Sequence, residues 1–433
     1  MLKNRTTRRD FLRASAAAGA AAFALPAFAQ DKSPSQKLNV AIIGPANRGA
    51  AQLAAAGSME NVVAICDVDE NNLGATNEKY PKAKKFIDFR KMFDEMAKEI
   101  DAVMVSTADH THAPASAMAM RLGKHCYCEK PLTHSVYEAR VLAELAKEKN
   151  LVTQMGTQIH AEDNYRRVVE LIQAGAIGPV TEVRAWSPAK YGGGKRPTET
   201  PEVPKHLHWD EWLGPAPFRP YHPCYMPFVW RGWWDFGNGG LGDFGCHLMD
   251  LAFWALKLRH PTTIAAEGPA VDPESCAEGL TVHYEYPARG DLPPVKLTWY
   301  DGDKAKDPEI PPGSNVVAGN MGVLFIGKDG MLRADYGSRT LYPIEKFKDF
   351  KAPEPTIPKS IGHHKEFFEA CKNGGPTTCN FDYAGALTEA VLLGNVSFRT
   401  GKKLEWDAAK LKATNCPEAD QYIQRPYRQG WAL

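Results

Sequence analysis

A glycine-rich turn between a short apolar run and a helix constrains the fold more than any other feature of the sequence. The run LNVAIIG, residues 38–44, predicts a buried strand, and the turn after it carries Gly44, Ala46 and Gly49 as G-x-A-x-x-G. A helix over about residues 48–56 follows directly. A strand, a tight turn and a helix in this order predict the opening half of a parallel βαβ unit.

Asp67 supports a ligand at this turn. It lies at the end of the next apolar run, VVAICDVD. In dinucleotide-binding turns, a pyrophosphate rests on the helix N-terminus, and an acid about 20 residues further on binds the ribose hydroxyls. We therefore expect a dinucleotide at Asp67 and at the turn residues Gly44, Ala46, Asn47, Arg48 and Gly49. A plain strand–turn–helix without a ligand is the alternative.

The acid also bears on the choice of dinucleotide. The Asp67 carboxylate favours NAD because it would repel the 2′-phosphate of NADP. Arg48 leaves NADP open, since its cation would serve a phosphate or would simply be a solvated residue at the helix start.

Apolar runs and helical stretches alternate as far as Gly156. The runs DAVMVST, HCYCEK and LVTQMG predict strands. Residues 112–122 predict a helix with Pro114 in its first turn, and Ser135 and Glu138 predict a capping box for the next helix. This rhythm predicts an α/β Rossmann nucleotide-binding domain with a parallel sheet over residues 38–156.

The pattern changes in residues 157–433. Helices are expected over about 163–174, 363–371 and 383–399, and strands at VTEVRAW, LTVHYEY, VKLTWYDG, MGVLFIG and GMLRADY. Residues 187–238 form a long irregular stretch rich in Pro, Gly, Trp, Tyr and His. We expect an α+β second domain with a predominantly antiparallel open sheet, which serves substrate binding and oligomerisation and includes the tail after Lys402.

Residues 1–29 have the pattern of an export signal. Arg8 and Arg9 stand side by side, an Ala-rich run follows, and Ala27-Phe28-Ala29 gives a small-x-small cleavage pattern before Gln30. The run is too short to span a bilayer. We expect a twin-arginine signal that takes the folded protein to the periplasm, then a linker over 30–37. A cytoplasmic protein with a chance basic N-terminus is the alternative.

Composition narrows the classes of partner and site. A formal net charge of +1 gives no basic surface for nucleic acid. The nine cysteines include no C-x-x-C pair and no Cys–His metal spacing, so we expect neither a structural metal nor a disulfide framework. No stretch beyond the signal is apolar and long enough for a membrane helix.

Two further segments carry residues suited to acid–base chemistry. Lys130 ends a strand of the first sheet, where ligands gather, so its ammonium would reach the crevice unless it is merely a solvated lysine. Asp243 and His247 lie four apart in GGLGDFGCHLMD, on one face of a helix that Asp250 would extend. A carboxylate beside an imidazole would suit a proton acceptor. A capping Asp with a core His, or a metal site lacking a third ligand, are the alternatives.

The sequence resembles the Gfo/Idh/MocA family of sugar and polyol oxidoreductases. The resemblance rests on AIIGPANRG with AICDVD, then STADHTHA, CEKPLTHS and GGLGDFGCHLMD, in that order over residues 38–250. It implies that Lys130 is catalytic and borders the nicotinamide, and that His247 is the acid/base with Asp243 as its partner. It also implies cofactor contacts for Glu129, Thr107 and His112, although Thr107 and His112 would also suit a helix cap.

The irregular stretch suggests a substrate wall. Aromatic faces cover the apolar faces of sugar rings, and Arg or His edges bind hydroxyls. The candidates in this stretch are Tyr191, Trp230, Arg231 and Trp234. Gln158 and His160 are further candidates, because they follow the last predicted strand of the first domain, where the two domains should meet. Aromatic packing of a long loop, or an interface between subunits, is the alternative.

Three functions fit these features. The first is NAD(P)-dependent hydride transfer at a CH–OH group of a sugar or polyol. The second is a glycoside hydrolase that uses tightly bound NAD in a cycle of oxidation, elimination and reduction, as some members of the resembled family do. The third, a non-catalytic sugar-binding protein, is disfavoured by the presence of Lys130, Asp243 and His247. A homodimer or tetramer is expected from the resembled family's second domain.

Overall fold

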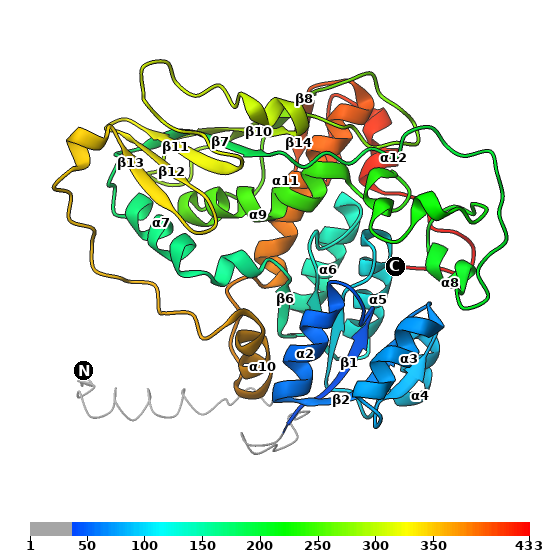
Figure 1. Ribbon diagram of the computed structural model, residues 1–433. Coiled ribbons are helices and arrows are strands. Elements are labelled where there is room, and N and C mark those ends of the chain that lie inside the picture. The colour runs from blue at the N-terminus through cyan, green and yellow to red at the C-terminus, as the bar shows by residue number, and fades with distance from the viewer. Residues whose placement is uncertain (1–36) are drawn as a thin grey trace, which may run out of the picture. The chain divides into compact units, whose positions relative to one another are not determined.

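The computed structural model describes residues 37–433. The expected export signal and nearly all of the linker lie outside the described residues. Within the described chain there are two sheets, one of six strands and one of nine (Figure 1). They confirm the predicted Rossmann domain followed by an α/β domain with a mostly antiparallel sheet. No helix in residues 37–433 is long and apolar enough to cross a membrane.

The first sheet is entirely parallel, with the strand order β3-β2-β1-β4-β5-β6. Its strands are β1 (Asn39–Ile43), β2 (Asn61–Cys66), β3 (Lys84–Phe86), β4 (Ala102–Val105), β5 (His125–Cys128) and β6 (Thr153–Met155). The crossover helices are α2 (Gly49–Met59), α3 (Glu70–Lys79), α4 (Phe89–Met96), α5 (Asp109–Arg121) and α6 (Val136–Glu148). The strand order reverses between β1 and β4, and a crevice for ligands forms at the carboxyl ends of strands at such a point.

The second sheet has the order β13-β12-β11-β7-β10-β9-β8-β14-β15, with β7 and β10 as a parallel pair. The strands are β7 (Val180–Ser187), β8 (Thr263–Glu267), β9 (Thr281–Tyr286), β10 (Val295–Asp301), β11 (Gly322–Gly327), β12 (Met331–Ala334), β13 (Arg339–Tyr342), β14 (Leu404–Asp407) and β15 (Lys412–Ala413). Helices α7 (Asp163–Gln173), α9 (Gly239–Leu256) and α11 (Phe381–Thr400) pack with its apolar side chains in one large core (Figure 1).

The other face of this sheet is partly covered by the chain itself. Trp186, Tyr300 and Leu324 are buried there, and Ala305 and Val316 from the segment after β10 pack on them. The segment therefore shields side chains that would otherwise face outward.

The predicted capping box is confirmed. Ser135 Oγ accepts from the backbone N–H of Glu138, and the Glu138 carboxylate accepts from the N–H of Ser135 at 2.9 Å. The expected start of the preceding helix is wrong, because α5 begins at Asp109 and places Pro114 inside it. Proline lacks the N–H that a carbonyl one turn earlier would accept, and a side chain from the tail supplies a donor instead.

That donor is Arg425. Its Nη2 donates to the His110 carbonyl oxygen at 2.7 Å, and its Nε donates to Glu138 Oε1 at 3.1 Å. Helix α10 (His363–Asn373) also packs on the first domain, against α2, and α11 packs along α6 (Figure 1). The end of the chain thus returns to the Rossmann domain, whereas the sequence alone left open which domain the tail contacts.

Candidate active site

The glycine-rich turn leaves no room for side chains at two positions. Gly44 has φ +77°, and a Cβ there would lie 2.7 Å from the Ser106 carbonyl oxygen. A Cβ on Gly49 would lie 1.8 Å from the Gly44 carbonyl oxygen. Asn47, next to Ala46 in the turn, also has a positive φ, of 50°. Strand and helix approach so closely that the turn presents backbone, as a phosphate-binding turn does.

Asp67 follows β2 at the same edge of the sheet. Its carboxylate accepts from the Asp69 N–H at 2.9 Å and from Asn72 Nδ2 at 3.3 Å. Burial raises the pKa of Asp67 to about 6, although these hydrogen bonds oppose the rise. Arg48, the other residue expected to choose between NAD and NADP, lies with its Nε 3.5 Å from Glu129 Oε1. Arg48 therefore has an acidic partner in the protein itself.

Glu129 lies at the centre of a cluster of buried polar side chains behind the glycine-rich turn. Its Oε1 accepts from Tyr127 at 3.0 Å and from Gln52 Nε2. Burial raises the pKa of Glu129, while the Arg48 and Lys130 charges lower it.

The crevice also contains buried polar atoms with no hydrogen-bond partner in the described chain. They are Ser106 Oγ after β4, Glu129 Oε2 after β5 and Gln158 Oε1 after β6. Buried polar atoms normally have partners, and these three lie after neighbouring strands at the ligand-binding edge. Together with the turn that excludes any Cβ, they fit a bound dinucleotide.

Lys130 and Asp243 form a contact between the two domains at the ligand-binding edge of the first sheet. Lys130 follows β5, and its Nζ donates to the Asp243 carboxylate and, at 3.0 Å, to the Asp243 carbonyl oxygen. On the other side, Arg231 Nε donates to Asp243 Oδ1 at 3.2 Å. Burial raises the pKa of Asp243, but the two cations outweigh burial and bring the pKa below its ordinary value. The carboxylate is therefore ionised and fixes both cations.

His247 lies on α9 with Asp243, as the spacing predicts, but the expected pairing differs. The cations at Lys130 and Arg231 occupy the Asp243 carboxylate, and Nδ1 of His247 is buried without a partner. Burial, with Lys130 second, lowers the pKa of His247 to about 3. The imidazole is therefore neutral, and burial together with the Lys130 charge opposes its protonation until negative charge develops beside it. The backbone at this point is held by Tyr165, whose hydroxyl donates to the His247 carbonyl oxygen at 2.9 Å.

Neither Thr107 nor His112 caps a helix, because the residue before α5 is Ala108. The ring nitrogens of His112 lie 2.8 Å from the Pro131 carbonyl oxygen and 3.1 Å from that of Thr107. Burial lowers the pKa of His112 to about 4. His112 therefore braces the turn after Lys130 against the end of β4.

Gln158 and His160, the two substrate candidates after the last strand of the first domain, have different surroundings. Gln158 keeps a buried oxygen without a partner, as noted above. His160 instead binds Asp250, with Nδ1 3.0 Å from its carboxylate, and stacks on Trp254 at 4.0 Å. Tyr383 donates to the same carboxylate at 2.6 Å. Asp250 therefore does not extend the catalytic face but joins a buried cluster.

The candidates from the irregular stretch 187–238 also differ, because some lie at the site and one lies in the core. Burial, with the Asp243 charge second, raises the pKa of Tyr191, and the Arg231 guanidinium lies over the Trp230 ring at 4.2 Å, so these three gather at the site. Trp234 is 5% exposed, and its Nε1 donates to the Asp272 carbonyl oxygen at 3.1 Å. Trp234 is part of the core, where apolar burial rather than substrate determines its place.

Sequence reasoning passed over two residues beside this site. Asp109, in the first turn of α5, is buried and accepts from Asn238 Nδ2 at 3.2 Å. Burial raises the pKa of Asp109 to about 7, while the charges of Arg231 and Lys130 lower it. Tyr336, from the β12–β13 turn, packs against His247 with 6.0 Å between ring centroids, and its hydroxyl has no partner. Asp109 stands in STADHTHA and could have been found there, whereas Tyr336 had no such motif.

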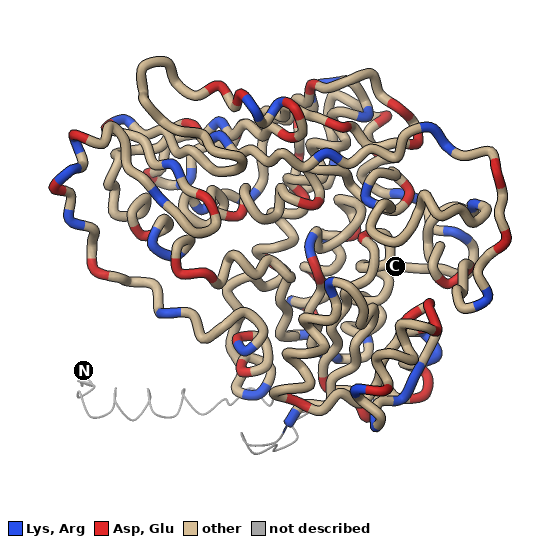
Figure 2. The backbone as a smooth tube through the Cα atoms, in the orientation of Figure 1, with Lys and Arg blue, Asp and Glu red and all other residues tan. Residues whose placement is uncertain are grey.

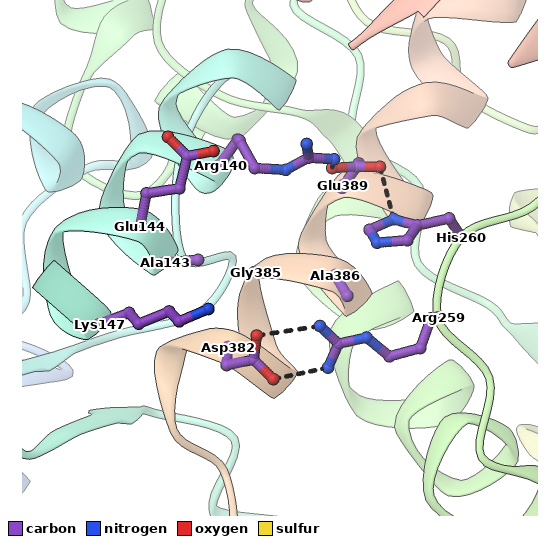
Figure 3. Close-up of a pocket in the computed structure, with 10 residues that line it drawn as sticks. All are labelled: Arg140, Ala143, Glu144, Lys147, Arg259, His260, Asp382, Gly385, Ala386 and Glu389. Carbon is purple, nitrogen blue, oxygen red and sulfur yellow. Dashed lines mark hydrogen bonds and ion pairs between the residues drawn. The ribbon is translucent and has the colours of Figure 1, made fainter. Parts of the chain in front are cut away.

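A second hollow lies away from these residues, between α6 and α11 (Figure 3). It has a volume of about 230 Å³. Five of its side chains pair with one another: Arg259 with Asp382 at 2.8 Å, and Glu389 with both Arg140 and His260. Figure 2 shows the same mixing of acids and bases along the whole described chain.

Two family models match the chain. One, the oxidoreductase family with an NAD-binding Rossmann fold, matches residues 38–157. The other, the C-terminal alpha/beta domain of the same family, matches residues 167–303. Together they cover more than half of the sequence.

Individual relatives are more distant. An uncharacterized oxidoreductase of Schizosaccharomyces pombe is 26% identical over 201 residues, 45% of this chain and 44% of the relative. Inositol 2-dehydrogenase of Salmonella typhimurium is 28% identical over 120 residues, 27% of this chain and 35% of the relative. This chain thus aligns with less than half the length of either relative.

A solved structure shows the same fold. Levoglucosan dehydrogenase in complex with NADH and L-sorbose superposes with a TM-score of 0.56 at 17% identity, covering 86% of this chain and 99% of the other. The family models and this fold agree with the Rossmann sheet and the second domain described above. The chain belongs to the Gfo/Idh/MocA oxidoreductase family and has its NAD-binding Rossmann domain.

Proposed function

We propose that the protein transfers hydride between NAD and a CH–OH group of a sugar or polyol. The observation that carries the proposal is the Lys130–Asp243 contact beside the unpartnered, neutral His247, at the ligand-binding edge of the Rossmann sheet. Inositol 2-dehydrogenase and levoglucosan dehydrogenase, both named for sugars or polyols, are among the relatives.

The protein side chains divide the work of oxidising a carbinol. Bound NAD supplies the hydride acceptor. The Lys130 ammonium donates a hydrogen bond to the hydroxyl oxygen, which stabilises negative charge there as the proton leaves. His247, whose neutral imidazole has an unpartnered Nδ1, is the group placed to accept that proton. Asp243, itself bound by Arg231, holds Lys130 in position, so the carbonyl product forms against a fixed donor.

The cellular location is the second part of the proposal. The adjacent Arg8 and Arg9, the Ala-rich run and the small-x-small pattern support twin-arginine export to the periplasm with the cofactor already bound. Replacing both arginines by lysine should leave the protein in the cytoplasm, as cell fractionation with blotting would show. Export of the double variant at the normal level would contradict this route.

Export also favours one second function. The periplasm supplies no free nicotinamide cofactor, so a cycle that oxidises a glycoside, eliminates the aglycone and reduces the product again would suit an exported chain. A non-catalytic sugar-binding role would leave the Lys130–Asp243 pair and the free His247 without use.

Association into dimers or tetramers stays a prediction, which light scattering of the mature protein tests.

The test begins with the purified mature protein. We expect denaturation to release about one NAD per chain after extensive dialysis, and sugars or polyols to change the nicotinamide absorbance of the bound cofactor. Lys130→Ala and His247→Ala should abolish that change and keep the cofactor, because neither residue belongs to the glycine-rich turn. Lys91→Ala, at an exposed position of α4, is the control. Full activity of either site variant, or a chain without NAD, would refute the proposal.

A further inference from the structure

Segment 187–238 contains two groups of aromatic residues that differ in their surroundings. One group is buried and forms an apolar cluster that anchors the segment: Trp209, Trp212, Tyr225, Trp233 and Phe236. The other group, which we call the aromatic rim, consists of Tyr191, Phe228 and Trp230 and surrounds Arg231. Trp230 also packs against the buried cluster, whereas Phe228 stands outside it.

Arg231 connects the aromatic rim to the catalytic residues. Its Nε donates to Asp243 Oδ1 at 3.2 Å, and Asp243 in turn holds Lys130. Its guanidinium lies 4.3 Å from the Phe228 ring centroid and 4.2 Å from that of Trp230. The rim rings are thus fixed at one arginine's length from the Asp243 carboxylate.

Phe228 is unusual in both exposure and backbone. Its side chain is 56% exposed, beside Val229 at 46%. Its φ is +64°, a left-handed conformation that is a true outlier for a bulky residue. Arg231 Nη1 donates to the Phe228 carbonyl oxygen at 3.2 Å and helps to hold this conformation. Such strain costs free energy and persists where the surroundings impose it, most often at ligand sites.

Neither the exposed ring of Phe228 nor its left-handed backbone stabilises the fold. An exposed ring buries little apolar surface, and glycine would occupy the same backbone conformation without strain. The Tyr191 ring packs edge-on against Phe228 at 5.8 Å. Burial, with the Asp243 charge second, raises the pKa of Tyr191, so the rim extends to the Asp243 carboxylate.

We propose that the aromatic rim binds a second ring of the substrate, which is therefore a glycoside rather than a free sugar. The inference rests on the proposed function and names its substrate class. The sugar to be oxidised lies beside Lys130 and His247, and the ring attached through its glycosidic bond lies on Phe228. A flat apolar ring face is the chemistry recognised, and a second sugar and an aryl group both present one.

The experiment compares four kinds of ligand at one site. Reduction of the bound cofactor is followed with free hexoses, their methyl glycosides, their nitrophenyl glycosides and their disaccharides. We expect KM to be lower for substrates with a second ring than for the methyl glycoside of the same sugar. Comparing disaccharide with nitrophenyl glycoside tells which of the two rings the rim prefers.

Phe228→Gly is the decisive variant. It removes the ring and also relieves the left-handed strain, so the melting temperature should stay the same or rise. KM for two-ring substrates should rise about tenfold, the loss of one aromatic stacking contact, while values for free and methylated sugars stay unchanged. Phe218→Ala, at a phenylalanine of the same segment that is 67% exposed, should change neither.

Three results would overturn the inference. One is equal KM for methyl and nitrophenyl glycosides and disaccharides in the wild type. Another is a Phe228→Gly variant that binds every ligand as the wild type does, or that loses all of them equally. If no sugar of any kind changes the bound cofactor, the proposed function fails first and the inference fails with it.

Discussion

Lys130 and Asp243 come from different domains and form a contact that exists only when those domains are packed together. Lys130 follows strand β5 of the Rossmann sheet, and Asp243 lies near the start of α9 in the second domain. The Lys130 ammonium bonds both the carboxylate and the backbone carbonyl oxygen of Asp243. The position of the reacting amine is therefore set by the domain interface.

The first prediction concerns this contact. Asp243→Asn keeps the side-chain shape but removes the charge that holds Lys130 and Arg231. We expect turnover to fall by about 10² to 10³, in the range seen when a positioned donor is lost. The NAD content should not change. Steady-state kinetics and cofactor analysis measure the two.

The matched control is Asp382→Asn, which breaks an ion pair with Arg259 whose two side chains are 73% and 46% exposed. Such a pair contributes only about 0–1 kcal/mol, so turnover should stay at the wild-type level. An Asp243→Asn enzyme with unchanged turnover would show that Lys130 needs no anchor.

The second prediction is a pH dependence of NAD affinity. The pKa of Asp67 is raised to about 6 by burial, and the ribose hydroxyls donate best to the ionised carboxylate. Binding therefore favours the deprotonated form. As the pH falls below about 6, the dissociation constant of NAD should rise, approaching tenfold per pH unit. Titration of cofactor-free protein from pH 5 to 8 measures it.

Asp67→Asn serves as the comparison for this titration. An amide does not ionise, so the variant should bind NAD more weakly at pH 8 and with no inflection near pH 6. If the wild type binds equally well at pH 5 and pH 8, Asp67 does not hold the ribose.

The third prediction uses the buried Asp109. Its folded pKa, about 7, exceeds the value near 3.8 of an ordinary aspartate. Protonated Asp109 therefore contributes stability to the folded state. This contribution is fully present below pH 3.8 and is lost as the pH rises through 7. Asp109→Asn avoids the buried charge, so it should be more stable than the wild type at pH 8, by on the order of 1–4 kcal/mol.

At pH 5 the same variant should gain much less, because the wild-type carboxyl is already protonated there. Turnover of the variant should fall, since Asp109 lies in the field of Lys130 and Arg231. Denaturant unfolding at the two pH values measures the stability difference. An equal gain at both would assign it to packing, and not to ionisation.

The predictable part of the site is the part that local sequence determines. The turn at Gly44, the spacing to Asp67 and the shared helix of Asp243 and His247 follow from strand and helix periodicity, and the structure has all three. The capping box at Ser135 is equally local. Each depends on residues close together in the chain.

The unpredicted part depends on contacts between distant segments. Whether Asp243 would pair with His247 or with Lys130 depends on how the domains pack, and spacing along one helix does not contain that information. The surroundings of His160 also depend on distant segments. The sequence predicts it at the site, but it lies in a buried cluster with Asp250 and Tyr383. Trp230 and Trp234 are tryptophans of the same segment, and the sequence gives no sign that Trp234 belongs to the core.

The last prediction tests the return of the tail to the first domain. Arg425 Nε donates to Glu138 Oε1 at 3.1 Å, and its Nη2 donates to the His110 carbonyl oxygen, which Pro114 leaves without its helical donor. The Glu138 side chain is 1% exposed. Arg425→Ala would leave that carboxylate without its cation, at a cost of about 3–5 kcal/mol. Denaturant unfolding measures the loss, and Arg259→Ala, at the exposed pair with Asp382, should cost at most about 1 kcal/mol. Equal costs for the two variants would mean that the tail does not stabilise the Rossmann domain.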